Sequence, residues 1–463
     1  MLFFVRSLAS QTIFKATREL YKTYNGVIQL HALHFRCVNI YDPEDIATIL
    51  SSEQFNEKDV PYNFIRPWLN NGLITSNGHK WLQRRKMLTP AFHLNVLKKF
   101  VEVFVEHVEH FQKSVESEGA NEKTNLYQLI SQVTLKILCE TSMGTSKQCS
   151  LESVFHKYFH AIEAISECAL QRTCRVWYFF DWIYNLTNTG QKQKKIIEDL
   201  HGFSQYIIRN RRHFLELQNG RIIEENTKTG ESKGRLAMID LLFQNEKKRK
   251  IDESGIREEV DTFLFAGYDT ISTALTFFIM RIANEPTIQE KIHQEIENIF
   301  GDSDRAPSFE DLNEMKYTEC CIKESLRIYP SVPFISRYVR NEIVLGGYTI
   351  PAGTQVSIMI YDLHHREDIY PEPEKFIPER FLPSNQMKNH PFAFIPFSAG
   401  YRNCLGQKYA MLEMKTLISG LFRKYRVEPV TRTEDIVFRM AITLRTTQPI
   451  YAKIIKKKQN KTN

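Results

Sequence analysis

The sequence predicts a mainly α-helical protein with minor β structure, built as a single large domain over residues 1–463. Helical periodicity of the apolar residues dominates from about residue 80 to residue 330. β-rich runs interrupted by glycine and proline follow at residues 341–360, a pattern typical of short strands. The chain contains neither an internal repeat nor a clear linker, so we expect one domain and not several.

The individual elements are predicted as follows. Residues 11–25 have the pattern of an amphipathic helix, and residues 27–33 and 35–41 alternate like two short strands. Asp42 and Pro43 predict the start of a helix, with Asp42 as the N-cap and Pro43 in the first turn. Polar breaks at residues 219–233 and 301–308 indicate surface loops. Helix returns at residues 405–421, and a basic, solvated tail is expected from about residue 456.

Composition excludes several classes of protein. The 61 Lys and Arg residues exceed the 54 Asp and Glu residues by only 7, too small an excess for a typical nucleic-acid-binding protein. The eight cysteines include no Cys-x-x-Cys pair, which argues against a structural zinc module, a disulfide scaffold or an oxidising compartment. The apolar segment at residues 262–279 is long enough to resemble a membrane span, but Asp269 and Gly267 within it favour a buried core helix.

The most informative segment is FSAGYRNCLG, residues 397–406. Cys404 is a candidate thiolate ligand for a haem iron, at the N-terminus of a predicted helix whose dipole favours the thiolate. Gly400 and Gly406 would let the backbone approach a flat macrocycle, Arg402 would pair with a propionate, and Phe397 would shield the sulfur. The alternative is that Cys404 is a buried structural cysteine, but the fixed spacing of the residues around it argues against this alternative.

This segment resembles the haem-binding signature of the cytochrome P450 monooxygenases. The resemblance implies a helical bundle around haem b with small β-sheets, and Cys404 as the axial ligand of the iron. A thiolate ligand increases the electron density on the iron and favours O–O cleavage.

The segment AGYDT, residues 266–270, is similar to the central-helix motif of the same family. The small residues Ala266 and Gly267 would leave room for dioxygen beside the helix, and Gly267 would permit a local bulge. By resemblance, Thr270 would hydrogen-bond the bound oxygen and Asp269 would help to deliver protons from solvent. A polar pair satisfied within the core is the structural alternative.

Two further sets of residues match the family in the expected order. Glu324 and Arg327 in KESLR, with Arg380 in PERF, imply an ion-pair network that holds the cysteine loop. Trp81 and Arg85, four residues apart, could both face a haem propionate, and Arg337 matches another propionate-binding arginine. Surface salt bridges are the alternative for Arg85 and Arg337.

The segments at residues 77–93 and 258–270 resemble the family-four branch, whose members hydroxylate fatty acids, hydrocarbons, hormones and foreign compounds. Many members of that branch carry a glutamate that can be esterified to the haem where this chain has Ala266, so non-covalent haem is expected and terminal-carbon selectivity is not implied. The chain also starts without the family's N-terminal membrane anchor. We expect an incomplete gene product or membrane association through surface contacts.

The predicted function is therefore a monooxygenase that uses O2 and two electrons from NADPH, delivered by a reductase with cytochrome b5 as a possible second donor, at the cytosolic face of the endoplasmic reticulum membrane. An apolar lining of the substrate pocket is expected from Phe64, Ile65, Phe263, Val332, Phe334, Ile335, Ile442 and Leu444. The expected basic docking face for the reductase consists of Lys86, Lys98, Lys408 and Lys415. Two alternatives remain: a peroxide-rearranging enzyme of this fold, and a non-catalytic or truncated haem-binding protein.

Overall fold

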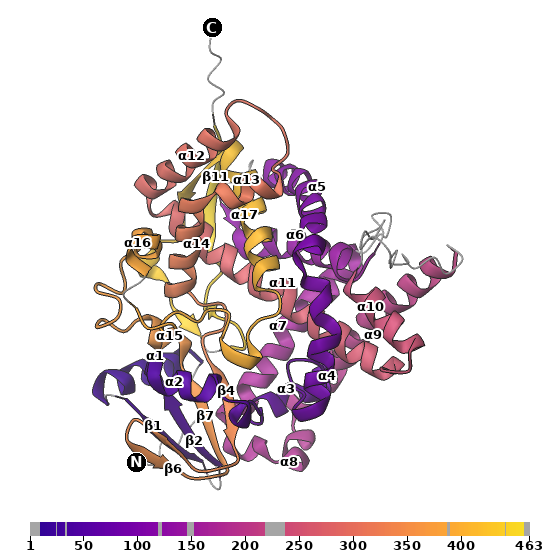
Figure 1. Ribbon diagram of the computed structural model, residues 1–463, viewed down its shortest axis with the longest axis vertical. Helices are drawn as coiled ribbons and strands as arrows, with labels where there is room; N and C mark the ends of the chain where they lie inside the picture. The colour runs from indigo at the N-terminus through magenta and orange to yellow at the C-terminus, as the bar shows by residue number, and fades with distance from the viewer. Residues whose placement is uncertain are drawn as a thin grey trace.

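The computed structural model describes residues 10–24, 26–32, 35–118, 123–145, 152–217, 237–386, 389–439 and 441–457. Helices dominate these residues and the strands form small sheets, which confirms the predicted mainly α-helical class (Figure 1). The helices are α1 (Ser10–Thr23), α2 (Pro43–Leu50), α3 (Tyr62–Leu69), α4 (Gly78–Leu88), α5 (Leu94–Glu118), α6 (Leu126–Thr141), α7 (Glu152–Cys174), α8 (Asp181–Leu186), α9 (Asn188–Leu217), α10 (Met238–Lys247), α11 (Glu253–Ala283), α12 (Pro286–Phe300), α13 (Phe309–Glu314), α14 (Lys316–Ile328), α15 (Ile360–His364), α16 (Pro383–Gln386) and α17 (Gln407–Lys424). The strands are β1 (Ile28–Ala32), β2 (Phe35–Ile40), β3 (Thr124–Asn125), β4 (Ile335–Val339), β5 (Ile343–Leu345), β6 (Tyr348–Ile350), β7 (Thr354–Ile358), β8 (Tyr425–Pro429), β9 (Phe438–Arg439), β10 (Arg445–Thr446) and β11 (Tyr451–Lys456).

The elements predicted near the start of the chain are present. Helix α1 is followed by β1 and β2, which pair antiparallel. Asp42 caps α2 because its Oδ1 accepts a hydrogen bond from the Glu44 N–H at 3.0 Å, and Pro43 occupies the first turn, where it sacrifices no helical hydrogen bond.

The largest sheet has the strand order β1-β2-β7-β4 and lies at the lower left of Figure 1. Strand β7 pairs parallel with β2 and antiparallel with β4, so it joins the N-terminal hairpin to the chain that follows α14. The hairpin β5–β6 turns at Gly346 and Gly347, whose φ angles of 55° and 78° favour glycine. The short strands predicted at residues 341–360 are therefore confirmed.

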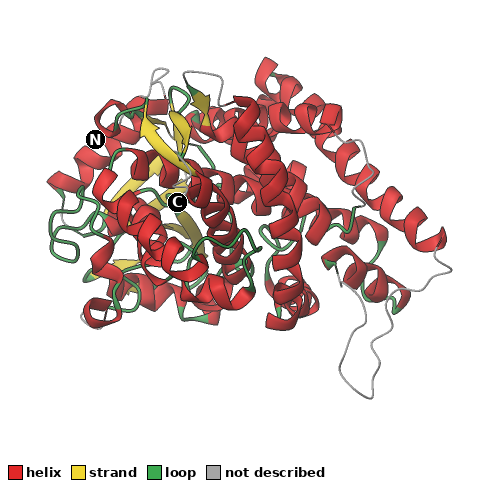
Figure 2. Ribbon diagram, turned by 90° about the horizontal axis from the view of Figure 1, so that it is seen from above, coloured by secondary structure: helices red, strands yellow, loops and turns green. Residues whose placement is uncertain are grey.

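Helix α11 runs through the helical half of the molecule. Its apolar side chains contribute to two core clusters, one shared with α5, α12, α14 and α17, the other with α3, α7, α9 and α10. In the described part of the chain it is the one helix long and apolar enough to cross a membrane, and most of its apolar stretch is buried within the protein. The right half of Figure 2 is helical throughout, whereas the strands lie in its left half among further helices.

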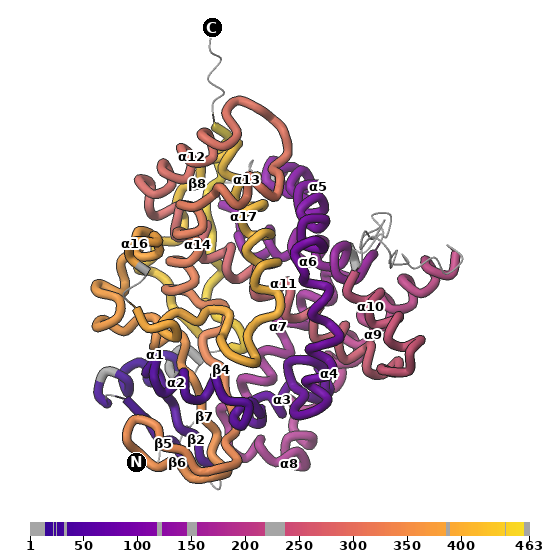
Figure 3. The backbone as a smooth tube through the Cα atoms, in the orientation of Figure 1, coloured from indigo at the N-terminus to yellow at the C-terminus, as the bar shows by residue number. Residues whose placement is uncertain are grey.

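The loops are only partly covered by the structure. Residues 301–308 connect α12 to α13 without regular structure, as predicted. The predicted loop at residues 219–233, the first nine residues and the tail beyond residue 457 lie outside the described residues. The segment before α17 lies beside α4, although the two are 318 residues apart in sequence at Arg85 and Asn403 (Figure 3). This approach forms one side of the candidate site.

Candidate active site

The segment that contains Cys404 forms a tight loop before α17. The Cys404 N–H donates to the Phe397 carbonyl at 2.9 Å, and the Asn403 N–H donates to the Gly400 carbonyl at 3.2 Å. Gly400 has a φ of 68°, and a Cβ added there would lie 1.9 Å from the Leu50 carbonyl oxygen. Glycine is needed here because the loop packs against the end of α2, and the expected role of Gly400 beside a macrocycle stays a prediction.

The Cys404 thiol opens into a cavity but is otherwise enclosed by protein. This enclosure raises the pKa of the thiol, while a hydrogen bond from the Gly406 N–H and the charge of Arg85 act in the opposite direction. The two Arg85 Nη atoms donate to the carbonyl and the side-chain oxygen of Asn403 at 2.7 and 2.6 Å. Arg85 thus holds the residue next to Cys404 and supplies a positive charge near the sulfur.

The cavity in front of Cys404, which we call the central cavity, has a volume of about 320 Å³. Helices α4 and α11 and the cysteine loop contribute to its wall. The predicted cofactor residues on its lining are Trp81, Arg85, Ala266, Gly267, Phe397, Arg402, Cys404 and Gly406. The predicted substrate residues on its lining are Ile65, Phe263, Val332, Ile335 and Ile442.

Three predicted pocket residues do not line the central cavity. Phe64 lies in the core beside the ring of Phe179, at 5.0 Å between ring centroids. Phe334 packs against the cluster of the β-sheet, and Leu444 lines a different cavity. Each is adjacent in sequence to a position on or near the cavity, and the neighbouring side chain points another way.

Arg402 lies next to the central cavity as a buried cation with unused hydrogen-bonding capacity. Its Nη2 donates to the Ser76 carbonyl at 2.6 Å and to Asn77 Oδ1 at 3.0 Å, and its guanidinium stacks 4.4 Å above the centre of the Trp81 ring. Its Nε and Nη1 are buried and have no hydrogen-bond partner among the described residues. Burial, and secondly the charge of Arg337, lower the pKa of Arg402 to about 9.

Two more cations accompany Arg402: Arg337 is buried and Lys58 is half-buried. Arg337 is 2% exposed and donates to the Ser336 carbonyl at 2.9 Å. The Lys58 Nζ lines the central cavity and donates to the Ile74 carbonyl at 2.9 Å. Burial lowers the pKa of Lys58 well below its usual range, with the charges of Arg402 and Arg337 adding to the effect. None of these three cations forms an ion pair with a carboxylate in the described ranges of the chain, so the site is set up to hold an anionic group.

The polar residues of α11 face different surroundings. The Thr270 Oγ1 lines the central cavity and donates to the Ala266 carbonyl at 2.8 Å. Gly267 lies on the lining, but a Cβ added there would be 2.5 Å from Leu138 Cδ1, so its small size also serves the packing of α11 against α6. Asp269 is 1% exposed and forms an ion pair with Arg445.

The predicted ion-pair residues are in contact. Arg327 binds Glu324 through two hydrogen bonds of 2.8 Å, and both side chains are fully buried. The Arg380 Nε lies 3.5 Å from Glu324 Oε1. Arg327 also donates to the carbonyls of His364 and Pro373 at 2.9 and 2.7 Å. The network therefore joins α14 to the irregular chain that leads to the cysteine loop.

Comparison with known proteins decides the family. The family model described as cytochrome P450 matches residues 1–454. The chain belongs to the cytochrome P450 family.

Individual relatives agree with this assignment. Cytochrome P450 4c3 of Drosophila melanogaster is 40% identical over 432 residues, which cover 90% of this chain and 79% of that protein. Cytochrome P450 4c21 of Blattella germanica is 37% identical over 433 residues, covering 93% and 86% of the two chains, respectively. Cytochrome P450 4V2 of Homo sapiens is 35% identical over 421 residues, covering 90% and 80%. The chain is thus a cytochrome P450 monooxygenase of the family-four branch.

The family implies a haem with a thiolate ligand, and the residues of this cytochrome P450 fit that group. The Cys404 thiol opens into the central cavity, and beside it two buried nitrogen atoms of Arg402 have no partner in the described part of the chain. A haem carries two propionate carboxylates, which would neutralise the otherwise unbalanced charges of Arg402, Arg337 and Lys58.

The sequence did not predict some residues of this P450 that contact the central cavity or Asp269. Lys58 belongs to none of the recognised motifs, and only the fold brings it to the central cavity. Arg445 and Tyr127 contact Asp269 from positions more than 140 residues away in sequence. Thr443 falls inside the predicted pocket range of Ile442 to Leu444, but its contact with Asp269 was not predicted. A buried carboxylate such as Asp269 needs a polar partner, but the sequence does not indicate which residue supplies it.

Proposed function

We propose that this cytochrome P450 monooxygenase hydroxylates an apolar substrate of the fatty-acid or hydrocarbon class, with hormones and foreign compounds of similar character as further substrates. The observation that carries the proposal is that the Cys404 thiol opens into a cavity whose lining beyond the cations is mostly apolar. Such a lining favours an apolar ligand by the free energy of removing its surface from water.

Different residues of the chain have different roles around the cofactor. Bound haem, with a thiolate on its iron, supplies the activation of dioxygen. Cys404 provides the thiolate, and the Gly406 N–H with the Arg85 charge favours its ionised form. Arg402, Arg337 and Lys58 bind the propionates, with Trp81 stacked on the Arg402 guanidinium. Thr270 offers a hydroxyl inside the cavity.

Ala266 determines how the haem is held. It lines the central cavity and carries no carboxylate, so no ester to the haem can form at this position. The haem is therefore bound non-covalently. Denaturing chromatography should separate all the haem from the polypeptide, and haem that remains with the protein would contradict this assignment.

The function is tested first by the absorbance spectrum of the reduced protein with carbon monoxide. A strongly red-shifted Soret band is expected, and Cys404→Ser should abolish it because the thiolate is lost. A series of saturated fatty acids is then titrated while the Soret band is monitored, and oxidised products are measured with NADPH and a reductase. Product formation that needs no NADPH would favour the peroxide-rearranging alternative, and absence of haem would favour the non-catalytic one.

The reductase is proposed to dock near the cysteine loop through exposed basic residues. Lys86 on α4 and Lys408 on α17 are exposed, and Lys98 on α5 is exposed but lies 3.4 Å from Glu310. Lys415 is removed from the predicted set, because it is buried and its Nζ bonds to the Leu312 carbonyl and Glu319. The reductase-dependent rate should fall with increasing ionic strength and with Lys408→Glu; a salt-independent rate would contradict electrostatic docking.

Attachment to the endoplasmic reticulum membrane is proposed through one end of the molecule. Helix α8 and the segment before it expose Trp177, Trp182 and Leu186 at 50%, 69% and 79%, and the β5–β6 hairpin at the same lower end of Figure 1 exposes Val344 and Tyr348. Exposed apolar side chains gathered in this way favour a lipid surface. Trp182→Ser with Leu186→Ser should reduce sedimentation with phospholipid vesicles, whereas Leu82→Ser, at an exposed position on α4 outside this set, should not.

A further inference from the structure

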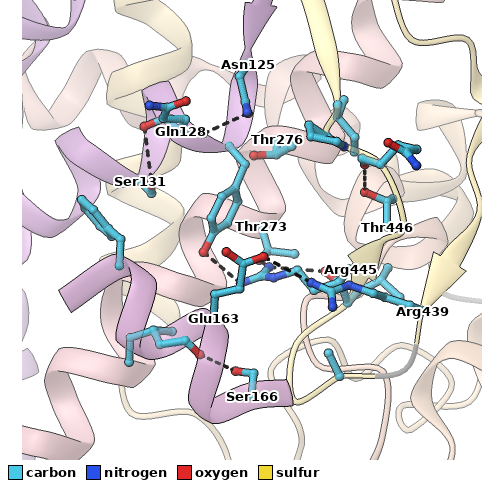
Figure 4. Close-up of a pocket in the computed structure, with 18 of the residues that line it drawn as sticks. Asn125, Gln128, Ser131, Glu163, Ser166, Thr273, Thr276, Arg439, Arg445 and Thr446 are labelled. Carbon is cyan, nitrogen blue, oxygen red and sulfur yellow. Dashed lines mark hydrogen bonds and ion pairs between the residues drawn. The ribbon is translucent and has the colours of Figure 1, made fainter. Parts of the chain in front are cut away.

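A second cavity lies on the other side of α11 from the cysteine loop. We call it the outer cavity; its volume is about 380 Å³, and α6, α7, α11 and the β9–β10 segment surround it. Its lining is mixed, and Figure 4 shows the polar part: α11 contributes Thr273 and Thr276, α7 contributes Glu163 and Ser166, and Arg445 reaches in from β10. Its outer part contains an ion pair of 3.6 Å between Arg439 and Glu163. These polar groups offer hydrogen-bond partners for water, while apolar side chains such as Phe159 and Leu170 line the rest of the outer cavity.

Asp269 lies between the outer cavity and the central cavity and lines neither of them. One carboxylate oxygen, Oδ1, accepts a hydrogen bond from the Tyr127 hydroxyl at 2.6 Å and is paired with Arg445. Tyr127 and Arg445 both line the outer cavity. The other oxygen, Oδ2, accepts a hydrogen bond from the Thr443 hydroxyl at 2.8 Å. Thr443 lines the central cavity, so the two carboxylate oxygens are each connected to a different cavity.

Thr270 does not make this connection, although it follows Asp269 in the sequence. Its hydroxyl donates to the Ala266 carbonyl on its own helix. Consecutive residues of an α-helix point about 100° apart, so the side chains of Asp269 and Thr270 face different directions. The contact of Asp269 with the central cavity instead runs through a residue 174 positions away in sequence.

We propose that Thr443 transfers protons from Asp269 to the central cavity, and that the outer cavity resupplies Asp269 past Arg445 and Tyr127. In each transfer the protonated Asp269 carboxyl donates its proton to Thr443 Oγ1 while the Thr443 O–H releases its own proton into the central cavity. The Tyr127 hydroxyl then gives its proton to the Asp269 carboxylate and regains one from water in the outer cavity, so one proton crosses and no group is consumed. A hydroxyl can serve in this way because it both donates and accepts.

The role of Thr443 is not explained by packing alone. Thr443 is 3% exposed, and its hydroxyl donates to a carboxylate that Arg445 and Tyr127 already bind. Hydroxylation with dioxygen consumes protons in each cycle, and slow proton supply allows the reduced oxygen to leave as hydrogen peroxide. The share of NADPH that ends in peroxide therefore reports on Thr443 directly.

The test compares Thr443→Val with Thr443→Ser, which keeps the hydroxyl. Product formed per NADPH is expected to fall about tenfold in Thr443→Val, with a matching rise in peroxide, and to recover in Thr443→Ser. The control is Thr354→Val, a fully buried strand threonine whose hydroxyl bonds only to the Pro351 carbonyl in the described residues. The measurement uses any apolar compound that shifts the Soret band, so it does not depend on the proposed substrate class.

A second readout does not involve turnover. In urea unfolding of the haem-loaded protein, Asp269→Asn and Thr443→Val should be non-additive because the two side chains are in contact, whereas Asp269→Asn and Thr354→Val should be close to additive. The proposal is overturned if Thr443→Val keeps the normal product per NADPH, if Thr443→Ser fails to restore it, or if Asp269→Asn and Thr443→Val are additive. A reduced carbon monoxide spectrum for each variant separates these outcomes from simple loss of haem.

Discussion

Glu324→Gln is expected to destabilise the protein strongly because it leaves a fully buried guanidinium without its counter-charge. Glu324 and Arg327 are both 0% exposed and share two hydrogen bonds of 2.8 Å. The amide oxygen of the variant side chain could still accept from the Ile377 N–H, which Glu324 binds at 2.9 Å, but it can accept only one of the two guanidinium bonds. Removing one partner of such a buried pair costs about 3–5 kcal/mol.

Urea unfolding at neutral pH measures this loss, followed by far-ultraviolet circular dichroism and by the Soret band. The matched control is Glu290→Gln, which breaks an exposed pair with Arg426 at 3.2 Å and should change the free energy of unfolding by less than about 1 kcal/mol. Because Arg327 also holds the carbonyls of His364 and Pro373, the Soret band should be lost at lower urea than the helical signal. A change below about 1 kcal/mol for Glu324→Gln would refute the reasoning.

Three further predictions concern the haem site and the core. Lys58→Met should speed the transfer of haem to apomyoglobin by about tenfold or more, because a charge-assisted hydrogen bond contributes about 1.5–3 kcal/mol. Lys58→Arg keeps the charge and should restore the slow transfer. Equal transfer rates for the wild type and Lys58→Met would exclude Lys58 as a propionate ligand. Gly400→Ala should prevent normal haem loading, since its Cβ would lie 1.9 Å from the Leu50 carbonyl, whereas Gly202→Ala, which meets open space, should load normally. Burial raises the pKa of Asp261 from 3.8 to about 8, so the folded state keeps a proton that the unfolded chain loses, and stability should fall as pH rises through this window. Asp261→Asn should flatten the slope, which is at most about 1.4 kcal/mol per pH unit, in urea unfolding at several pH values; an unchanged slope would contradict the assignment.

The sequence was sufficient for features that depend on neighbouring residues. The cap formed by Asp42 and Pro43, the alternating strands and the long apolar helix all follow from spacing within a few residues. The cysteine loop was found in the same way, because its glycines, arginine and cysteine fall within ten residues. These predictions needed no knowledge of how distant segments meet.

The remaining features depend on contacts that only the folded chain creates. The reason for Gly400 is the Leu50 carbonyl, which lies 350 residues earlier, and nothing local to the cysteine loop indicates it. Lys415 was predicted to be exposed, but Glu319 and the Leu312 carbonyl bind it in the interior. Local periodicity indicates that a side chain is buried or exposed on average, and it does not indicate which distant group satisfies a buried charge.

The buried charges of this P450 separate into two kinds, and the difference bears on function. Arg327 and Arg445 are paired with the protein's own carboxylates, Glu324 and Asp269. Two nitrogen atoms of Arg402 are buried without a partner in the residues that the structure describes, and the Lys58 Nζ contacts the Ile74 carbonyl and the face of the Tyr62 ring. The charges of Arg327 and Arg445 are neutralised by carboxylates of the protein, whereas those of Arg402 and Lys58 are neutralised only when an anionic group enters the central cavity. Unbalanced buried charge destabilises the folded state. Haem binding is therefore expected to raise the stability of the protein, because the propionates neutralise these cations.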